Sequence, residues 1–269
     1  MESIFELENR LDISKELKKT MEQLFDDSRA TLYSTNNKVY NYHTLQDAIN
    51  DLVFLDWKYR DTFLTVEEFL ESINIDYEDL YYTDFEIDEI TFLHFIELLA
   101  NMKYLLEQHP EIKLSAKTSA CLNNIPLILE KMNYKLETLD DRVIITKRNA
   151  DVDSVLSIVP KNIAAILLEY NDFRIQNNLA AKKKILKDID LYIEKNIKLK
   201  SFDKELDNAI GTIVNKMGVN HPVEEEPYKS FTEKQLLEWY DKCFLMMLHA
   251  IRIPKIIDIK NERKTILSN

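Results

Sequence analysis

Apolar residues recur at three- and four-residue intervals along most of the chain, a spacing that predicts amphipathic helices. In the first half the pattern predicts helices over residues 4–29, 44–57, 65–73, 89–108 and 115–132. In the second half it predicts helices over residues 152–172, 180–198 and 202–217, and a further helix from residue 232 onward. Four consecutive helices that each carry one apolar face predict a four-helix bundle.

Residues 134–147 break this pattern, because apolar and polar positions alternate there on either side of Asp140-Asp141. Alternation with β-branched residues predicts a β-hairpin, the one β element that we expect. The predicted fold is mainly α, with an acidic helical domain over residues 1–133, a β-hairpin connector over 134–148 and a helical bundle over 149–264.

Turn chemistry supports these boundaries. Thr44 is a suitable N-cap, and Thr65 with Glu68 and Thr232 with Gln235 have the spacing of capping boxes. Gly218 is well placed to end the helix over 202–217.

The composition agrees with a helical protein, since only 2 glycines and 6 prolines occur in 269 residues. The net charge of -12 is unevenly spread. Residues 1–150 carry 16 basic and 29 acidic side chains, whereas residues 151–269 carry 19 and 18. This shift indicates two domains that meet near residue 150.

Several classes of protein are disfavoured by the sequence. No apolar run is long enough for a membrane span, and residues 1–12 lack the basic and apolar regions of a signal peptide. Cys121 and Cys243 show neither metal spacing nor a disulfide framework. There is no glycine-rich phosphate loop, HExxH, CxxC or serine-hydrolase elbow. We therefore expect a cytoplasmic protein without a membrane partner, cofactor or metal.

The polar loop over residues 216–228 concentrates the residues that turn a chain, with Gly218, Pro222 and Pro227 around Asn220-His221. A histidine at a helix C-terminus can act as a general acid or base near neutral pH. The competing interpretation is a loop histidine that makes only local hydrogen bonds.

A basic run covers residues 174–204, which hold nine basic and four acidic side chains. The nine are Arg174, Lys182, Lys183, Lys184, Lys187, Lys195, Lys198, Lys200 and Lys204. Such a run can bind a phosphate backbone, or it can be a solvated helix face.

An acidic belt covers residues 61–102, which hold twelve carboxylates and no Lys or Arg. Aromatic side chains are interleaved with the carboxylates between Asp76 and Glu86. This belt would repel nucleic acid and suit a basic protein partner or the basic patch of the chain's own second domain. The alternative is a solubilising loop.

The second half resembles a HEPN-type domain of the abortive-infection (phage defence) class, over about residues 134–260. The similar segments are the hairpin from Asp140 to Lys147, Leu168-Glu-Tyr-Asn-Asp-Phe173, Lys182-Lys-Lys-Ile-Leu186, Val219-Asn-His-Pro222, Tyr228-Lys229 and Leu237-Glu-Trp-Tyr-Asp241. The resemblance implies a helical bundle that forms a homodimer. It also implies a metal-independent ribonuclease whose Arg-x4-6-His motif activates the RNA 2′-hydroxyl and stabilises the developing charge.

The chain departs from this motif, because no Arg-x4-6-His occurs in it and Asn220 stands before His221. If the chain is a ribonuclease, the resemblance makes His221 the acid or base, Asn220 its polar partner and Lys216 the cation that faces the phosphate. Lys182, Lys183, Lys184, Lys187 and Arg174 would then bind the RNA. The alternative is a non-catalytic interaction or dimerisation protein that binds a basic protein through its acidic half.

Overall fold

The computed structural model describes residues 11–26, 30–33, 39–76, 86–223 and 227–267. The chain divides into two compact units, residues 1–145 and 146–269. Each unit has its own buried core, and each is described separately below.

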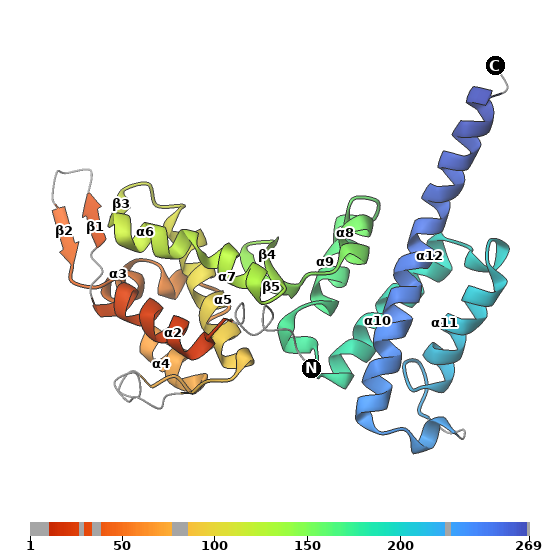
Figure 1. Cartoon of the computed structure of the whole chain (residues 1–269), viewed down its shortest axis with the longest axis horizontal. Helices are drawn as coiled ribbons and strands as arrows, with labels where there is room; N and C mark the ends of the chain where they lie inside the picture. The colour runs from red at the N-terminus through yellow and green to blue at the C-terminus, as the bar shows by residue number, and fades with distance from the viewer. Residues whose placement is uncertain (1–10, 27–29, 34–38, 77–85, 224–226, 268–269) are drawn as a thin grey trace, which may run out of the picture. The chain divides into compact units, whose positions relative to one another are not determined.

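The N-terminal unit combines short helices with two small sheets (Figure 1). Its helices are α2 (Ile13–Met21), α3 (Leu45–Leu52), α4 (Val66–Ser72), α5 (Glu89–Leu106), α6 (Ala116–Asn123) and α7 (Ile125–Lys131), with a π-helical turn η1 (Glu22–Asp26) and a 3-10 turn η2 (Phe54–Asp56). Strands β1 (Ala30–Tyr33), β2 (Val39–Tyr42) and β3 (Ile112–Leu114) form an antiparallel sheet in the order β2-β1-β3. Strands β4 (Tyr134–Leu139) and β5 (Arg142–Lys147) form the hairpin.

Helix α5 lies at the centre of this unit, because most of its length is buried. Two polar side chains on α5 anchor the hairpin. The Asn101 amide donates to the carbonyl of Val143 at 2.8 Å and accepts from its N–H at 2.9 Å, and Glu97 accepts from the N–H of Ile145 at 3.2 Å. These hydrogen bonds satisfy backbone groups on the edge of β5 that faces away from β4.

Elsewhere in this unit, Trp57 packs edge-on against Phe54 and Phe69.

The C-terminal unit is helical. It contains α8 (Ala150–Leu156), α9 (Lys161–Tyr170), α10 (Leu179–Asn196), α11 (Lys204–Lys216) and α12 (Glu233–Leu267), joined by 3-10 turns η4 (Phe173–Ile175), η5 (Leu199–Ser201) and η6 (Tyr228–Ser230). Helix α12 contacts α8, α10 and α11, and α10 also contacts α9. The prediction of a mainly α fold is confirmed.

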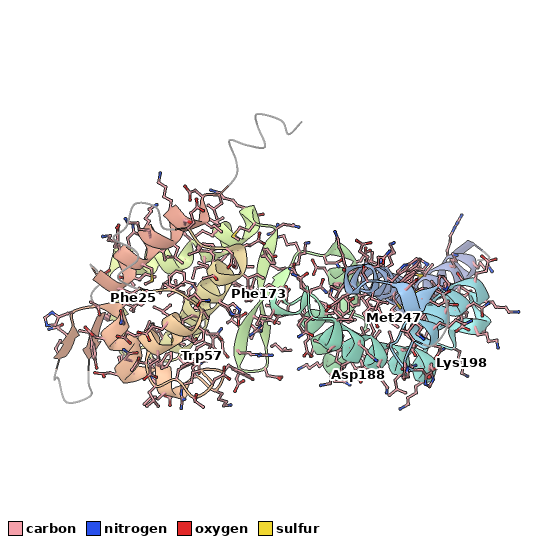
Figure 2. All side chains as sticks on the ribbon, turned by 90° about the horizontal axis from the view of Figure 1, so that it is seen from below. Phe25, Trp57, Phe173, Asp188, Lys198 and Met247 are labelled. Carbon is pink, nitrogen blue, oxygen red and sulfur yellow. The ribbon has the colours of Figure 1, made fainter. Side chains whose placement is uncertain are left out.

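The core of this unit forms between α10, α11 and α12, and buried residues of α8 and α9 complete it. Met247, which is fully buried, lies among these helices, whereas Lys198 lies at the edge of the unit (Figure 2). Helix α12 runs on beyond its neighbours (Figure 1). In the C-terminal half of α12, Ile256 and Ile259 are 40% and 54% exposed. Near the start of α12, Trp239 is half-buried beneath the amine of Lys242.

Two predicted helices are interrupted in the structure. The single helix expected over residues 152–172 is wrong, because α8 ends at Leu156 and Pro160 precedes α9. Proline has no N–H to continue a helical ladder. The helix expected over 115–132 is divided at Asn124, with Pro126 in the first turn of α7.

The prediction that the hairpin is the one β element is also wrong, because β1, β2 and β3 form a second sheet. Within the predicted helix over 4–29, α2 begins only at Ile13, where Asp12 caps it, and η1 follows. Residues 4–10 and 27–29 of that prediction lie outside the described residues. So do residues 77–85 of the acidic belt and 224–226 of the polar loop.

Among the described residues, no helix combines the length and apolar character that a membrane crossing requires. In the same part of the chain, no three His, Cys, Asp or Glu side chains are grouped so that they could hold a metal ion.

Candidate functional site

The loop after α11 is tightly built around Gly218, which has a φ of 92°. A Cβ at this position would lie 3.0 Å from Cγ2 of Val223. The Tyr240 hydroxyl donates to the carbonyl of Met217 at 2.9 Å, and the N–H of Asn220 donates to the carbonyl of Val214 at 2.8 Å. The predicted C-terminal glycine cap is confirmed, since Gly218 supplies the left-handed conformation that closes α11.

The Asn220 side chain is engaged with an acidic group rather than with His221. Its amide donates to the carboxylate of Asp190 on α10, while its Oδ1 atom is buried and has no hydrogen-bond partner among the described residues. Burial of Asp190, with the carboxylates of Glu194 and Asp207, raises the pKa of Asp190 to about 6, although the Asn220 bond opposes this shift. These three carboxylates line a cavity of about 710 Å3 between α10 and α11. Lys198 and Lys200 line the same cavity, so the lining as a whole carries a formal charge of -1.

His221 and Lys216 are both exposed. His221 makes no hydrogen bond or ion pair with any residue that the structure describes. Lys216 lies in the last turn of α11. Neither side chain lines the cavity of about 710 Å3 between α10 and α11.

The basic residues of α10 fall into two groups. Lys183, Lys184 and Lys187 lie on the solvent side of its first turns, with Lys184 and Lys187 exposed and Lys183 half-buried. Their three- and four-residue spacing makes them neighbours on the helix surface. Lys182 instead points inward, and its side chain is only 5% exposed.

Lys182 is held by a polar cluster that joins α9, α10 and α12. Its amine donates to Oδ1 of Asp241 at 2.5 Å, and the Tyr170 hydroxyl donates to the same oxygen at 2.9 Å. The amine also lies 5.2 Å from the centre of the Tyr170 ring, which stacks on Phe244 at 3.9 Å. Burial and the Asp241 carboxylate raise the pKa of Tyr170, so its hydroxyl remains a donor.

This cluster forms one wall of a cavity of about 370 Å3, which we call the polar cavity. Its lining includes three cations and one carboxylate, with four side-chain amides and an apolar side. These residues are Lys147, Arg148, Lys182, Asp241, Asn149, Asn171, Gln176, Asn177, Tyr170, Phe244 and Leu245. The formal charge of the lining is positive, so it favours an anionic ligand.

Local hydrogen bonds bring the end of β5 to this cavity. The N–H of Lys147 donates to the carbonyl of Asn171 at 2.9 Å, and Asn149 caps α8 while its amide donates to Asn171 at 3.3 Å. Arg174 is close in sequence, but its guanidinium pairs with the buried carboxylate of Asp172 at 2.5 Å. Its Nε and Nη2 atoms therefore donate to the protein, although the side chain is 33% exposed.

A second cavity, of about 480 Å3, lies in the N-terminal unit. Asp47, Glu67, Glu71 and Asp76 line it above an apolar floor of Phe25, Leu70 and Ile75, and its lining contains no Lys or Arg. Burial opposes ionisation of Glu67, but hydrogen bonds from its backbone and from Asn50 and Gln46 outweigh burial and lower its pKa. We call this the acidic cavity.

The sequence did not predict Asp241, Tyr170, Lys147 or Arg148 as site residues. A signal was nevertheless present, because Tyr170, Lys182 and Asp241 each lie in a segment that carries the HEPN resemblance. The structure brings these three segments together at one carboxylate oxygen.

The chain matches no family model, no curated protein and no solved structure.

Proposed function

We propose that the C-terminal unit binds RNA through Lys183, Lys184 and Lys187 of α10 and the adjoining polar cavity. The HEPN resemblance suggests RNA as the ligand and phage defence as the setting. The observation that carries the proposal is the positive lining of the polar cavity beside this row of lysines. Lysines that neutralise phosphates release counterions, which drives binding without a need for base-specific contacts.

Salt dependence tests this proposal. Single-stranded RNA should bind with a steep loss of affinity as salt rises, measured by fluorescence anisotropy. Replacing Lys183, Lys184 and Lys187 together by Gln should reduce the slope of log K against log salt by about 2, since each contact on a single strand contributes about 0.7.

The matched control carries Lys195→Gln, Lys198→Gln and Lys200→Gln, three exposed lysines in the last turn of α10, at the N-cap of η5 and within η5. It removes the same charge from the same region. Equal slopes for the two triple variants would refute a specific role for the first group.

Cleavage of RNA is a separate question. Because Asn220 donates to Asp190 among carboxylates, we expect no cleavage in the presence of EDTA and no change in RNA affinity for His221→Ala. Cleavage by the wild type that His221→Ala abolishes would instead establish a metal-independent ribonuclease centred on this loop.

The acidic cavity supports a second candidate function, the binding of a basic protein segment by the N-terminal unit. Four carboxylates over an apolar floor suit the charged end and the aliphatic stem of a Lys or Arg side chain. Three of these carboxylates belong to the acidic belt predicted from the sequence.

A labelled oligolysine peptide tests this second function. Glu71→Gln with Asp76→Asn should weaken its binding several-fold, about 0.5–1 kcal/mol for each exposed charge removed. Asp51→Asn with Asp61→Asn removes the same charge from exposed positions outside the cavity. If both pairs weaken binding equally, general attraction accounts for it and the cavity is not the site.

A further inference from the structure

We infer that the polar cavity binds a phosphate monoester, and that its ligand in RNA is the terminal phosphate of a strand. This inference rests on the proposed RNA binding for its choice of ligand. A free nucleoside monophosphate has the same chemistry and is distinguished in the experiment below.

The charge of the lining matches a dianion. Lys147, Arg148 and Lys182 face the cavity with one carboxylate, Asp241, which leaves a formal excess of two positive charges. A phosphate monoester carries about -1.5 to -2 charges at neutral pH, whereas each internal phosphodiester of a strand carries about -1. The terminal phosphate therefore gains more from this lining than an internal one.

The size of the cavity also favours a strand end. A volume of about 370 Å3 is near the lower limit of the roughly 300–1,000 Å3 usual for small-ligand sites. It has room for one phosphate and its attached sugar, rather than for several nucleotides in a row. Leu245, which is 46% exposed, gives the lining an apolar side against which the rest of that nucleotide can pack.

Lys182 makes this a built site rather than a patch of surface lysines. Its side chain is 95% buried, since only 5% is exposed, and Asp241 fixes its amine within the wall. An ammonium has three donors, and the bond to Asp241 uses one of them. The Tyr170 hydroxyl donates to the same oxygen of Asp241, so two donors position this carboxylate.

The experiment compares RNA oligonucleotides of one sequence with phosphate or hydroxyl ends. The wild type should bind the phosphorylated strand at least ~10-fold more tightly, the effect of one or two charge-assisted hydrogen bonds. Lys147→Gln should reduce this preference to about 2–3-fold and change the affinity for the hydroxyl strand much less. Lys161→Gln, an exposed change in the first turn of α9 outside the lining, should leave the preference intact.

Adenosine 5′-monophosphate distinguishes the two sources of the ligand. Its binding is measured directly by calorimetry and as competition against the phosphorylated strand. The inference is supported if the monophosphate lowers the affinity for the phosphorylated strand to that for the hydroxyl strand and leaves the affinity for the hydroxyl strand unchanged. A different result would be that the monophosphate binds, that Lys147→Gln weakens this binding, and that RNA does not bind. The site would then stand with a free nucleotide as its ligand, and the proposed RNA function would be overturned.

Two results would overturn the inference. If both strands bind equally and the monophosphate does not compete, the cavity is not a terminal-phosphate site, although RNA binding at α10 stands. If neither RNA nor monophosphate binds to protein whose thermal unfolding is normal, both the inference and the proposed function fail.

Discussion

At the scale of single residues, the pair formed by Lys182 and Asp241 is asymmetric in burial. The Lys182 side chain is 5% exposed and the Asp241 side chain 54%. If Lys182 is replaced, the Asp241 carboxylate that remains is hydrated. If Asp241 is replaced, the Lys182 ammonium that remains is buried without its counterion.

The two halves of the pair should therefore differ in their effect on stability. Asp241→Ala is expected to lower the free energy of unfolding by about 2–4 kcal/mol, because Lys182 and the Tyr170 hydroxyl both lose their acceptor. Lys182→Met should change it by less than about 1 kcal/mol. Urea denaturation measures both, and equal losses would contradict the asymmetry.

Asp190 should make stability depend on pH. Its pKa rises from an ordinary 3.8 to about 6 in the folded protein, so the folded state binds this proton more tightly than the unfolded state. The contribution of Asp190 to stability therefore decreases as pH rises from about 4 to about 6, and stays low above that range.

Asp190→Asn removes this effect. The free energy of unfolding of the variant, minus that of the wild type, should increase by about 1 kcal/mol across this pH range and then level off. The difference between the two proteins cancels the titration of other carboxylates. A difference that does not vary with pH would show that Asp190 titrates normally.

At the scale of elements, the two glycines of the chain differ in their position in α11 and in the space around them. Gly211 lies within α11, where an added Cβ would meet only Nδ2 of Asn215 at 3.9 Å. Gly218 closes that helix with a positive φ, and an added Cβ there would lie 3.0 Å from Cγ2 of Val223.

Alanine should therefore stabilise the protein at one glycine and destabilise it at the other. Gly211→Ala is expected to raise the free energy of unfolding by about 0.5–1 kcal/mol, and Gly218→Ala to lower it by about 1–3 kcal/mol. Thermal unfolding of the two variants gives the signs, and stabilisation by Gly218→Ala would contradict the geometry of this cap.

The long helices were predictable from the sequence because periodicity accumulates over many residues. Helices α5, α10 and α11 lie within two residues of their predicted ends, and Thr232 and Gln235 form the predicted capping box before α12. The three strands β1, β2 and β3 have only three or four residues each, too few for alternation to be distinctive.

The polar cavity was not predictable for a different reason. Its lining comes from segments far apart in the chain, and Lys182 meets Asp241 across 59 residues. Helical periodicity predicts which face of α10 is buried, but it does not predict which side chain of another helix lies against that face. The basic run was visible in the sequence, whereas the inward orientation of Lys182 depends on packing against α12.

At the scale of the whole molecule, the two units differ in charge. Residues 1–145 carry 14 basic and 29 acidic side chains, and residues 146–269 carry 21 and 18. This difference suits ligands of opposite sign, an anionic one at the polar cavity and a cationic one at the acidic cavity.

The homodimer that the resemblance implies remains a prediction. We expect Ile256 and Ile259 to make its contacts, because they are exposed apolar residues in the C-terminal half of α12. Replacing both with Glu should convert a dimer to a monomer in light scattering, whereas Leu191→Glu, an exposed change on α10, should not. A monomeric wild type would refute the prediction.

The two tryptophans of the chain fall one in each unit. Trp57 lies within an aromatic group and Trp239 lies 4.5 Å from the amine of Lys242, so their emission should respond to different surroundings. Trp57→Phe leaves tryptophan in the C-terminal unit alone, and Trp239→Phe leaves it in the N-terminal unit alone, so excitation selective for tryptophan over the 13 tyrosines reports on one unit. The unfolding and ligand response of each unit can thus be followed optically in the intact chain, without an attached dye.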